Sequence, residues 1–592
     1  MIVSLPWATG WVKRNAPRPP AYLNLIISLV AFVHGSLAFN DVLQTGSHII
    51  QFPWLNQADL RLSIILDISP TNLAVLELIT GLSFLSQLYA LGYLDKEWAL
   101  ARFFALAGFF EGAMSGVVLS ASLFQSYFLL EMLTLSTYLL VGFWYAQPLV
   151  VTAARDAFLT KRVGDILLLM GVVSLSALAG GMDFDNLYKW ADQNTLTTLT
   201  STLLGLALIA GPTGKCAQFP MHLWLDEAME GPNPASILRN SVVVAVGALV
   251  LLKLMPILQY SPVTIAVLLA IGIISALGGS LVSIAQVDIK RTLSYSTTAY
   301  LGLVFIAIAL QQSSLALLIL FAHGVAKALL SMSIGSVIAV SNCQDITELG
   351  GLANRMPATT SAYLLGAAGL TGLIPLGCFW CFGLSIELFS KQAPWLAAVY
   401  LLTNTLTALN LTRVFRQVFL GNPMTKTRRA IEVNWQMALP MVILMVITIL
   451  TPWMMTKIGI LPAISAFSLE AAIVVAISGL TGVMIGIMLP LNKAWSRSIK
   501  QSVRWLQDLL AFDFYTDRFY RLTIVNIVSS FSRLAAWFDT NIVNGLVNYI
   551  GRFSLDSAEG LRLSVSGRSQ TYILTVVITI VFLLASLSWL AS

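Results

Sequence analysis

Apolar runs long enough to cross a lipid bilayer recur along most of this 592-residue chain. Backbone N–H and C=O groups find no hydrogen-bond partners in lipid, so such runs must form helices or closed barrels. The alternating segments of about ten residues that form barrel strands are not seen, and only 10% of the residues are charged. The sequence therefore predicts an all-α polytopic membrane protein with about 15 or 16 transmembrane helices.

The predicted spans follow one another with short polar links, which indicates a single transmembrane domain over residues 1–490. Residues 1–12 resemble the end of a further, shortened helix. The spans are expected at 21–40, 70–94, 102–122, 124–146, 162–180, 198–213, 236–256, 262–283, 297–310, 314–341, 358–379, 394–412, 436–455, 467–490 and 571–591.

The region from 491 to 566 has a different pattern, with one apolar stripe along a long predicted helix and charged residues between its members. A helix with a polar face cannot easily span lipid, so it should lie along the membrane surface or against neighbouring helices. Residues 567–592 then form a transmembrane anchor. The stripe consists of Phe519, Leu522, Val525, Val528, Phe531, Ala535, Phe538, Ile542 and Leu546.

Glycine and proline interrupt the apolar pattern at 211–215, 231–234 and 370–377. Broken helices at membrane depth are tolerated where they line protein or water, and in transporters they occur in paired halves. The pattern favours a transporter-like core, although each interruption taken alone is also compatible with a simple kink or loop.

The ionisable residues that fall in or beside predicted spans include Glu111, Glu131, Asp165 and Lys215. A charge in hydrocarbon costs about 3 kcal/mol or more, so each is a candidate functional residue. Glu131 and Lys215 lie in separate helices and could pair, which would lower the cost of burying both. Asp165 begins a span and is equally compatible with a charge at the membrane boundary.

His323 and Lys327 lie four residues apart in another apolar run and share one helix face. Histidine titrates near neutral pH, and two such side chains together can pass a proton. A lone buried histidine is usually structural, but its spacing from a lysine favours a proton relay.

The remaining polar features favour no cofactor. The chain has no dinucleotide fingerprint, P-loop or iron–sulfur cysteine set, so redox chemistry would belong to other subunits. Cys378 and Cys381 are expected to be packing residues. The net charge of +6 is spread in short clusters, among them 161–162 and 290–291, which are typical of membrane-flanking residues rather than of nucleic-acid binding.

Residues 214–234, GKCAQFPMHLWLDEAMEGPNP, resemble the signature GKSAQxPxxxWLxxAMxGPTPxSALIH of the antiporter-like subunits of complex I. The stretches 288–296 and 323–338 also match, and the similarity covers nearly the whole chain. The predicted long amphipathic helix with its terminal anchor resembles the chain 5 subunit. The resemblance implies two inverted five-helix repeats, each with a broken helix, and a lateral helix that braces neighbouring subunits.

The resemblance also implies roles. Glu131 and Lys215 would form a coupling ion pair that Asp165 adjusts, and His323 and Lys327 would form the central relay of a proton path. No cofactor binds this subunit in the family, where flavin, iron–sulfur clusters and quinone are held by other subunits. The chain would thus be a non-redox subunit of a proton-translocating oxidoreductase.

Two positions depart from the family pattern. The histidine of the SALIHAA motif is replaced by Asn240, which follows Arg239, and the exit lysine of the FWSKDE motif is replaced by Phe382. With Glu111, these changes resemble the cyanobacterial variant of chain 5 that serves carbon dioxide uptake. Glu111, Arg239 and Asn240 are therefore candidate residues specific to a carbon dioxide module.

This resemblance implies a thylakoid NAD(P)H/ferredoxin–plastoquinone oxidoreductase that couples quinone reduction and proton movement to carbon dioxide hydration. The expected partners are a chain 4-type antiporter-like subunit, other membrane-arm subunits, a carbon dioxide hydration protein and the lipid bilayer. Two alternatives stay open: a scaffold that docks the hydration protein without pumping, and a respiratory chain 5 or sodium/proton antiporter subunit.

Overall fold

The computed structural model describes residues 18–57, 60–193, 196–391, 393–463, 467–488, 501–565 and 567–591. Side chains are described for these residues except 55–57, 60–62 and 501–504. The expected helix at 1–12 lies outside the described residues. The chain divides into two units, and the boundary in the sequence lies between Phe514 and Tyr515.

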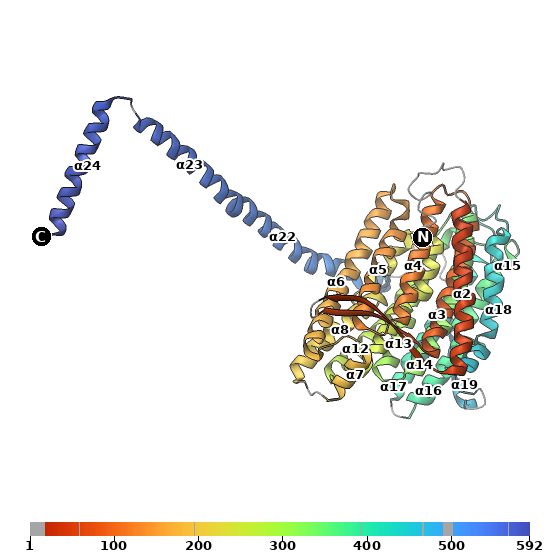
Figure 1. The fold of residues 1–592 in the computed structure, drawn as a ribbon. Coiled ribbons are helices and arrows are strands. Elements are labelled where there is room, and N and C mark those ends of the chain that lie inside the picture. Colours follow the sequence, from red (N-terminus) through yellow and green to blue (C-terminus); the bar gives the residue numbers. More distant parts are fainter. Residues whose placement is uncertain are drawn as a thin grey trace. The chain divides into compact units, whose positions relative to one another are not determined.

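The first unit is a bundle of helices standing side by side (Figure 1), which confirms the predicted all-α polytopic fold. Twelve helices in the described part of the chain are long and apolar enough to cross a membrane, and eleven belong to this unit. They are α2 (Arg18–Thr45), α3 (Pro70–Tyr93), α4 (Leu100–Leu119), α5 (Leu123–Val141), α6 (Pro148–Ala179), the run of α10 (Asn233–Leu238) into α11 (Val244–Leu258), α12 (Pro262–Ala285), α13 (Ile289–Ala309), α14 (Ser313–Ser341), α18 (Trp435–Ile458) and α19 (Leu469–Met488).

Helices α13 and α14 form the centre of the bundle, with nearly every residue buried. Small residues allow α12 to lie directly against α13. A Cβ atom on Gly302 would approach the backbone nitrogen of Ala276 and the oxygen of Gly272 to 2.6 Å. Such close backbone contact is a usual way in which membrane helices pack, and it holds α12 against the central helix α13.

Both expected broken helices are present. The later one ends as α15 (Pro357–Leu370) and resumes as α16 (Gly377–Phe389), as its glycine and proline content predicts. The earlier one, α8 (Thr198–Lys215), continues through Pro212 and breaks only after Lys215, before the short α9 (Leu223–Glu227). The predicted break at 211–215 is thus displaced towards the C-terminus. Helix α17 (Pro394–Val418) occupies the remaining predicted span.

A strand hairpin and a short helix of this unit were not predicted. Strands β1 (His48–Gln57) and β2 (Leu60–Ile68) form an antiparallel hairpin along the side of the bundle (Figure 1). The Ile65 backbone joins it to the start of α5, because its N–H donates to Gln125 Oε1 over 3.0 Å. The short helix α7 (Phe184–Gln193) packs beside α11 through a 2.7 Å hydrogen bond from the Tyr188 hydroxyl to the Lys253 carbonyl. Its charged face explains why no span was expected there.

The second unit begins with helical turns that run without interruption from Thr516 to Ser564, as the amphipathic pattern predicts. They comprise α21 (Thr516–Tyr520), α22 (Asn526–Phe538) and α23 (Asn544–Ser564), joined by π-helical turns. At 1.5 Å per residue the rod is about 70 Å long. Within this unit α24 (Ser569–Leu590) follows after a bend and has the apolar composition of the predicted anchor.

Candidate functional site

Lys215 ends the broken helix α8 and is buried inside the bundle, with 2% of its side chain exposed. Its ammonium nitrogen lies 2.5 Å from Asp165 Oδ1 on α6 and also donates a hydrogen bond to Thr134 Oγ1 on α5. The Thr134 hydroxyl in turn donates to Asp165 Oδ2 over 2.9 Å. Three helices thus enclose one hydrogen-bonded ion pair, the form in which buried charges are tolerated.

The expected Glu131–Lys215 ion pair is wrong, because Glu131 pairs with Arg162 instead. Glu131 and Thr134 lie one turn apart on α5, and Arg162 and Asp165 lie one turn apart on α6, so the facing helices pair turn by turn. Asp165 is also no boundary charge, since only 2% of its side chain is exposed. One ion pair, Glu131–Arg162, and one hydrogen bond, Thr134–Asp165, therefore join α5 to α6, and Lys215 of α8 completes the second link.

A second lysine, Lys161, lies within the same cluster. It was expected to flank the membrane, but 1% of the residue is exposed. Its ammonium donates to Thr137 Oγ1 over 3.0 Å and lies 3.5 Å from the centre of the Trp224 ring, a cation–π contact. Lys290 departs from the same expectation: it is buried and donates to the Gly231 carbonyl oxygen over 3.3 Å. The spacing of Lys161 from Asp165, one helical turn, is the signal that would have indicated a shared inward face.

His323 and Lys327 lie on one face of α14 and are both buried, as predicted. The Lys327 ammonium donates to the Leu293 carbonyl over 2.8 Å and to Ser296 Oγ, both on α13. The His323 ring stacks on Tyr300 with centroids 5.4 Å apart. Neither imidazole nitrogen has a hydrogen-bond partner among the described residues, so both remain able to accept or donate a proton.

Arg239 and Asn240 lie where α10 passes into α11 through a π-helical turn, Arg239–Val243. Both are buried, and the Arg239 guanidinium donates through Nη2 to Ser236 Oγ over 2.8 Å. Helix α14 packs against this turn, so the predicted pair belongs to the same interior region as the candidate relay on α14. Single-turn π-helices are frequent at functional positions.

Glu111 belongs to a different polar cluster, formed by α2, α3 and α4. Its carboxylate accepts a hydrogen bond from Ser28 Oγ at 2.9 Å and one from Gln87 Nε2 at 2.8 Å. Gln87 is in turn held by Asn24, whose amide donates to Gln87 Oε1 over 2.6 Å. Glu111 is therefore a buried carboxylate satisfied by neutral donors, apart from the Lys215 cluster.

Phe382, which stands where the resemblance expects a lysine, is buried in the second broken helix, α16. Its ring meets Tyr300 edge-on, with centroids 6.1 Å apart, on the same tyrosine that stacks with His323. Cys378 and Cys381, on the same helix, are free thiols. The end of the predicted path is therefore apolar and aromatic.

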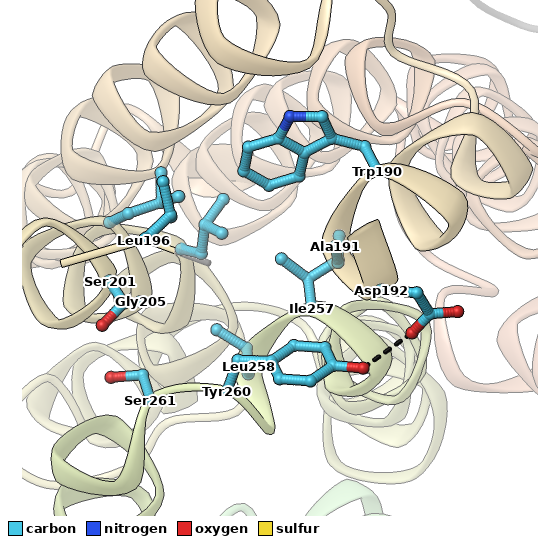
Figure 2. A pocket seen from close by; sticks show the side chains of 12 residues that line it. Trp190, Ala191, Asp192, Leu196, Ser201, Gly205, Ile257, Leu258, Tyr260 and Ser261 are labelled. Carbon is cyan, nitrogen blue, oxygen red and sulfur yellow. Dashed lines mark hydrogen bonds between the residues drawn. The ribbon is translucent and has the colours of Figure 1, made fainter. Parts of the chain in front are cut away.

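No group of three or more histidine, cysteine, aspartate or glutamate side chains that could hold a metal occurs among the described residues. A cavity of about 190 Å³ lies at the ends of α7, α8 and α11 (Figure 2). Apolar side chains line it together with the polar Asp192, Ser201 and Ser261, and the hydroxyl of Tyr260 donates to Asp192 over 2.6 Å. The candidate proton-path residues do not line it. The interior ionisable residues, rather than this cavity, are therefore the candidate functional site.

Two solved structures share this fold at 18% sequence identity. A chain of the archaeal membrane-bound sulfane sulfur reductase superposes with a TM-score of 0.69 over 82% of this chain and 97% of its own. A chain of the Mrp complex from Dietzia sp. superposes with a TM-score of 0.66 over 100% of this chain and 62% of its own. The chain thus has the same helical membrane fold as these two chains.

Residues 120–408 match the family described as NADH:quinone oxidoreductase/Mrp antiporter, and residues 54–104 match the chain 5 N-terminus of NADH-ubiquinone oxidoreductase (complex I). Subunit 5 of an NAD(P)H-quinone oxidoreductase from the Paulinella chromatophora chromatophore is 82% identical over 100% of this chain and 96% of its own length. The chloroplastic subunit 5 of Mesostigma viride is 29% identical over 95% of this chain and 92% of its own. The chain belongs to the family of NAD(P)H-quinone oxidoreductase subunit 5.

Proposed function

We propose that this subunit moves protons through its interior, driven by quinone reduction in other subunits of an NAD(P)H (ferredoxin)–plastoquinone oxidoreductase. The path begins at the Glu131–Arg162 and Asp165–Lys215 ion pairs and leads to His323 and Lys327. The observation that carries the proposal is the buried, three-helix enclosure of Lys215 at the end of a broken helix. Ionisable residues buried in a membrane typically serve ion or proton pathways.

We further propose that the complex is a cyanobacterial-type thylakoid enzyme that couples this movement to carbon dioxide hydration and uptake. Hydration of carbon dioxide releases a proton, and a proton path in the adjoining subunit would remove it. Glu111, Arg239 and Asn240 would serve this task, and Phe382 would redirect the exit. A chain 4-type antiporter-like subunit and a carbon dioxide hydration protein would be neighbours.

In this proposal residues 1–490 form the translocating domain, 491–566 the lateral helix region and 567–592 the membrane anchor. The exposed apolar side chains of Phe519 and Phe531, 64% and 68% accessible, support a bracing role, because such a surface needs cover from lipid or protein.

A Lys327→Ala substitution tests the coupling. We expect the complex to assemble and oxidise its electron donor, but quinone-driven carbon dioxide uptake by cells carrying the variant should be lost. Normal uptake in an assembled complex would refute the proposal.

A scaffold function is the second candidate, and the aromatic Phe382 in place of an exit lysine favours it. If the subunit only docks the hydration protein, Glu131→Gln and Lys215→Ala should leave carbon dioxide uptake nearly unchanged. Damage to residues 515–548 should then release the module. The two functions therefore predict opposite results for substitutions in the ion pairs.

A further inference from the structure

Lys161 is a buried cation without a carboxylate partner of its own. Only 1% of the residue is exposed. Its ammonium group donates to one hydroxyl, Thr137 Oγ1 at 3.0 Å, and lies 3.5 Å from the centre of the Trp224 ring. No ion pair of Lys161 occurs among the described residues. A buried charge without a counter-charge is costly, so a lysine at this position calls for a role that needs its charge.

A carboxylate lies one helical turn away from Lys161 on the same buried face of α6. It belongs to Asp165, and side chains at positions i and i+4 of a helix are close enough to form an ion pair. In the structure Asp165 instead contacts the ammonium of Lys215, which lies 2.5 Å from Oδ1. The charges of Asp165, Lys215 and Arg239 all act on Lys161, and of these three only Asp165 is negative. Two ammonium groups therefore share one carboxylate as their available counter-charge.

Helix α5 provides a neutral acceptor for each of the two lysines. Thr134 Oγ1 accepts a hydrogen bond from Lys215, and Thr137 Oγ1 accepts one from Lys161. The two threonines lie three residues apart, which places them on the same side of α5. Each ammonium group can therefore exchange a hydroxyl for the carboxylate by rotation of its side chain, without movement of a helix.

The Trp224 ring links the observed position of Lys161 to the broken helix. Trp224 is fully buried, and its Nε1 donates to the carbonyl oxygen of Gly214 over 2.7 Å. Gly214 directly precedes Lys215 in the last turn of α8. A change at the break that moves Lys215 would therefore also change the contact between Lys161 and the indole ring.

We propose that Lys161 is a second, alternative partner of Asp165. The inference rests on the proposed proton path and adds a residue to it. In the arrangement described, Lys215 holds the carboxylate and Lys161 lies against its threonine and tryptophan neighbours. In the other arrangement the Lys161 ammonium pairs with Asp165, and Lys215 is released with its proton towards the relay on α14. An unpaired buried ammonium is costly, which favours transfer of that proton to the next acceptor.

Infrared difference spectroscopy of the intact complex during quinone reduction tests the exchange of partners. A carboxylate that changes its partner shifts its stretching band, and the band of Asp165 is identified by its absence in Asp165→Asn. We expect this shift in the wild-type complex and its loss in Lys161→Met. Methionine has a similar length and no charge, and apolar replacement of a buried ion is often neutral or stabilising, so the variant should assemble. Lys161→Gln, which keeps a donor for Thr137 but lacks the charge, should lose the shift as well.

Lys253→Met is the matched control. The ammonium group of Lys253 also has neutral acceptors, the carbonyl oxygens of Val118 and Ser120 at 2.7 and 2.8 Å. This variant should keep the Asp165 shift, because Lys253 lies on α11 and not beside Asp165 on α6. A shift that persists in Lys161→Met, or that is lost to the same extent in Lys253→Met, would overturn the proposal.

The number of protons moved per quinone, measured on the same complexes, separates this inference from the proposed function. We expect fewer protons in both Lys161→Met and Lys327→Ala. If Lys327→Ala lowers the number and Lys161→Met does not, the role of Lys161 is refuted and the proton path stands. If Lys327→Ala keeps the wild-type number, the proton path itself is refuted.

Discussion

Asp165 is the residue on which the buried ion pair with Lys215 depends. It neutralises Lys215 and accepts the hydroxyl of Thr134, so two buried groups lose a partner if its charge is removed. Glu131 matters less to its partner. The Arg162 side chain is 41% exposed, so solvent can stabilise its charge when Glu131 is neutral. The sequence prediction paired Glu131 with Lys215 and gave Asp165 a secondary role, whereas in the structure Asp165 is the partner of Lys215.

Asp165→Asn should impair proton translocation much more than Glu131→Gln does. Breaking a buried pair from one side costs about 3–5 kcal/mol, whereas a partly exposed pair contributes about 1 kcal/mol or less. The measurement is quinone-dependent acidification of proteoliposomes that contain each variant complex. Equal loss in the two variants, or a larger loss for Glu131→Gln, would contradict this ranking.

The carboxyl of Asp226, in the short helix α9 outside the spans, gives a prediction for pH. Burial raises its pKa from 3.8 to about 7, against the opposing guanidinium of Arg291, 3.1 Å away. An acid with a raised pKa in the folded state stabilises the fold fully below its unfolded pKa, and this contribution is lost as pH rises through 7.

Asp226→Asn should therefore flatten the fall in thermal midpoint of the complex between about pH 4 and pH 7. The same variant should lack a carboxyl infrared band that disappears near pH 7. An unchanged pH slope in the variant would show that Asp226 is ionised throughout this range.

Which charged residues are buried could be predicted from the sequence more reliably than which residues they pair with. His323 and Lys327 share a helix face because i, i+4 spacing requires it, and that geometry is local. The partner of Lys215 depends on which turn of α6 faces α5, a tertiary fact that no spacing within either segment reveals. Lys161 was missed because it was grouped with Arg162 as a membrane-flanking cluster, although adjacent residues on a helix point in different directions and only Arg162 is partly exposed.

At the scale of elements, the break after Lys215 is linked to the C-terminal part of the first unit. His222, between α8 and α9, lies 2.6 Å from Asp513 through Nε2 and Oδ2. Asp513 follows helix α20 (Gln501–Ala511), whose last carbonyl accepts from Gln286 over 3.3 Å. The segment that leads out of the bundle is thus fastened beside the broken helix.

His222→Ala should loosen residues 505–514 by about 1–3 kcal/mol, the cost of leaving a buried polar group without its partner. Hydrogen exchange of the intact complex would detect faster exchange in that segment. His48→Ala, which changes an exposed histidine on β1, is the control and should leave the segment unchanged. Equal exchange in the wild type and in His222→Ala would mean that this contact does not hold the segment.

Helices were predictable because a span must satisfy its own backbone, whereas departures from helix were less so. The second break falls at 371–376, where glycine and proline are concentrated. The first break does not fall at its proline, because Pro212 lies inside α8 without ending the helix. The hairpin β1–β2 was missed although Leu60, Leu62 and Ile64 alternate with polar residues, because this alternation covers only five residues and β1 does not share it.

At the scale of the whole molecule, the second unit cannot be stable in water by itself. No residue of helix α24 is buried by its own unit, and within that unit the rod α21–α23 exposes large apolar side chains along its length. Helix α24 is apolar on all sides, so lipid can surround it. The amphipathic rod needs protein or the membrane interface on one side.

Ending the chain after Phe514 should therefore leave the first unit folded but release it from neighbouring subunits. Native gel electrophoresis of solubilised membranes would show a smaller complex, while the truncated chain remains in the membrane fraction. A complex of unchanged size would contradict the bracing role.

The most direct test of a proton path through this subunit is the number of protons moved per quinone reduced. Complexes with Lys327→Ala and with Lys189→Ala, which alters an exposed lysine on α7, would be compared in sealed vesicles. We expect fewer protons per quinone for Lys327→Ala and the wild-type number for Lys189→Ala. An assembled Lys327→Ala complex with the wild-type number would contradict it.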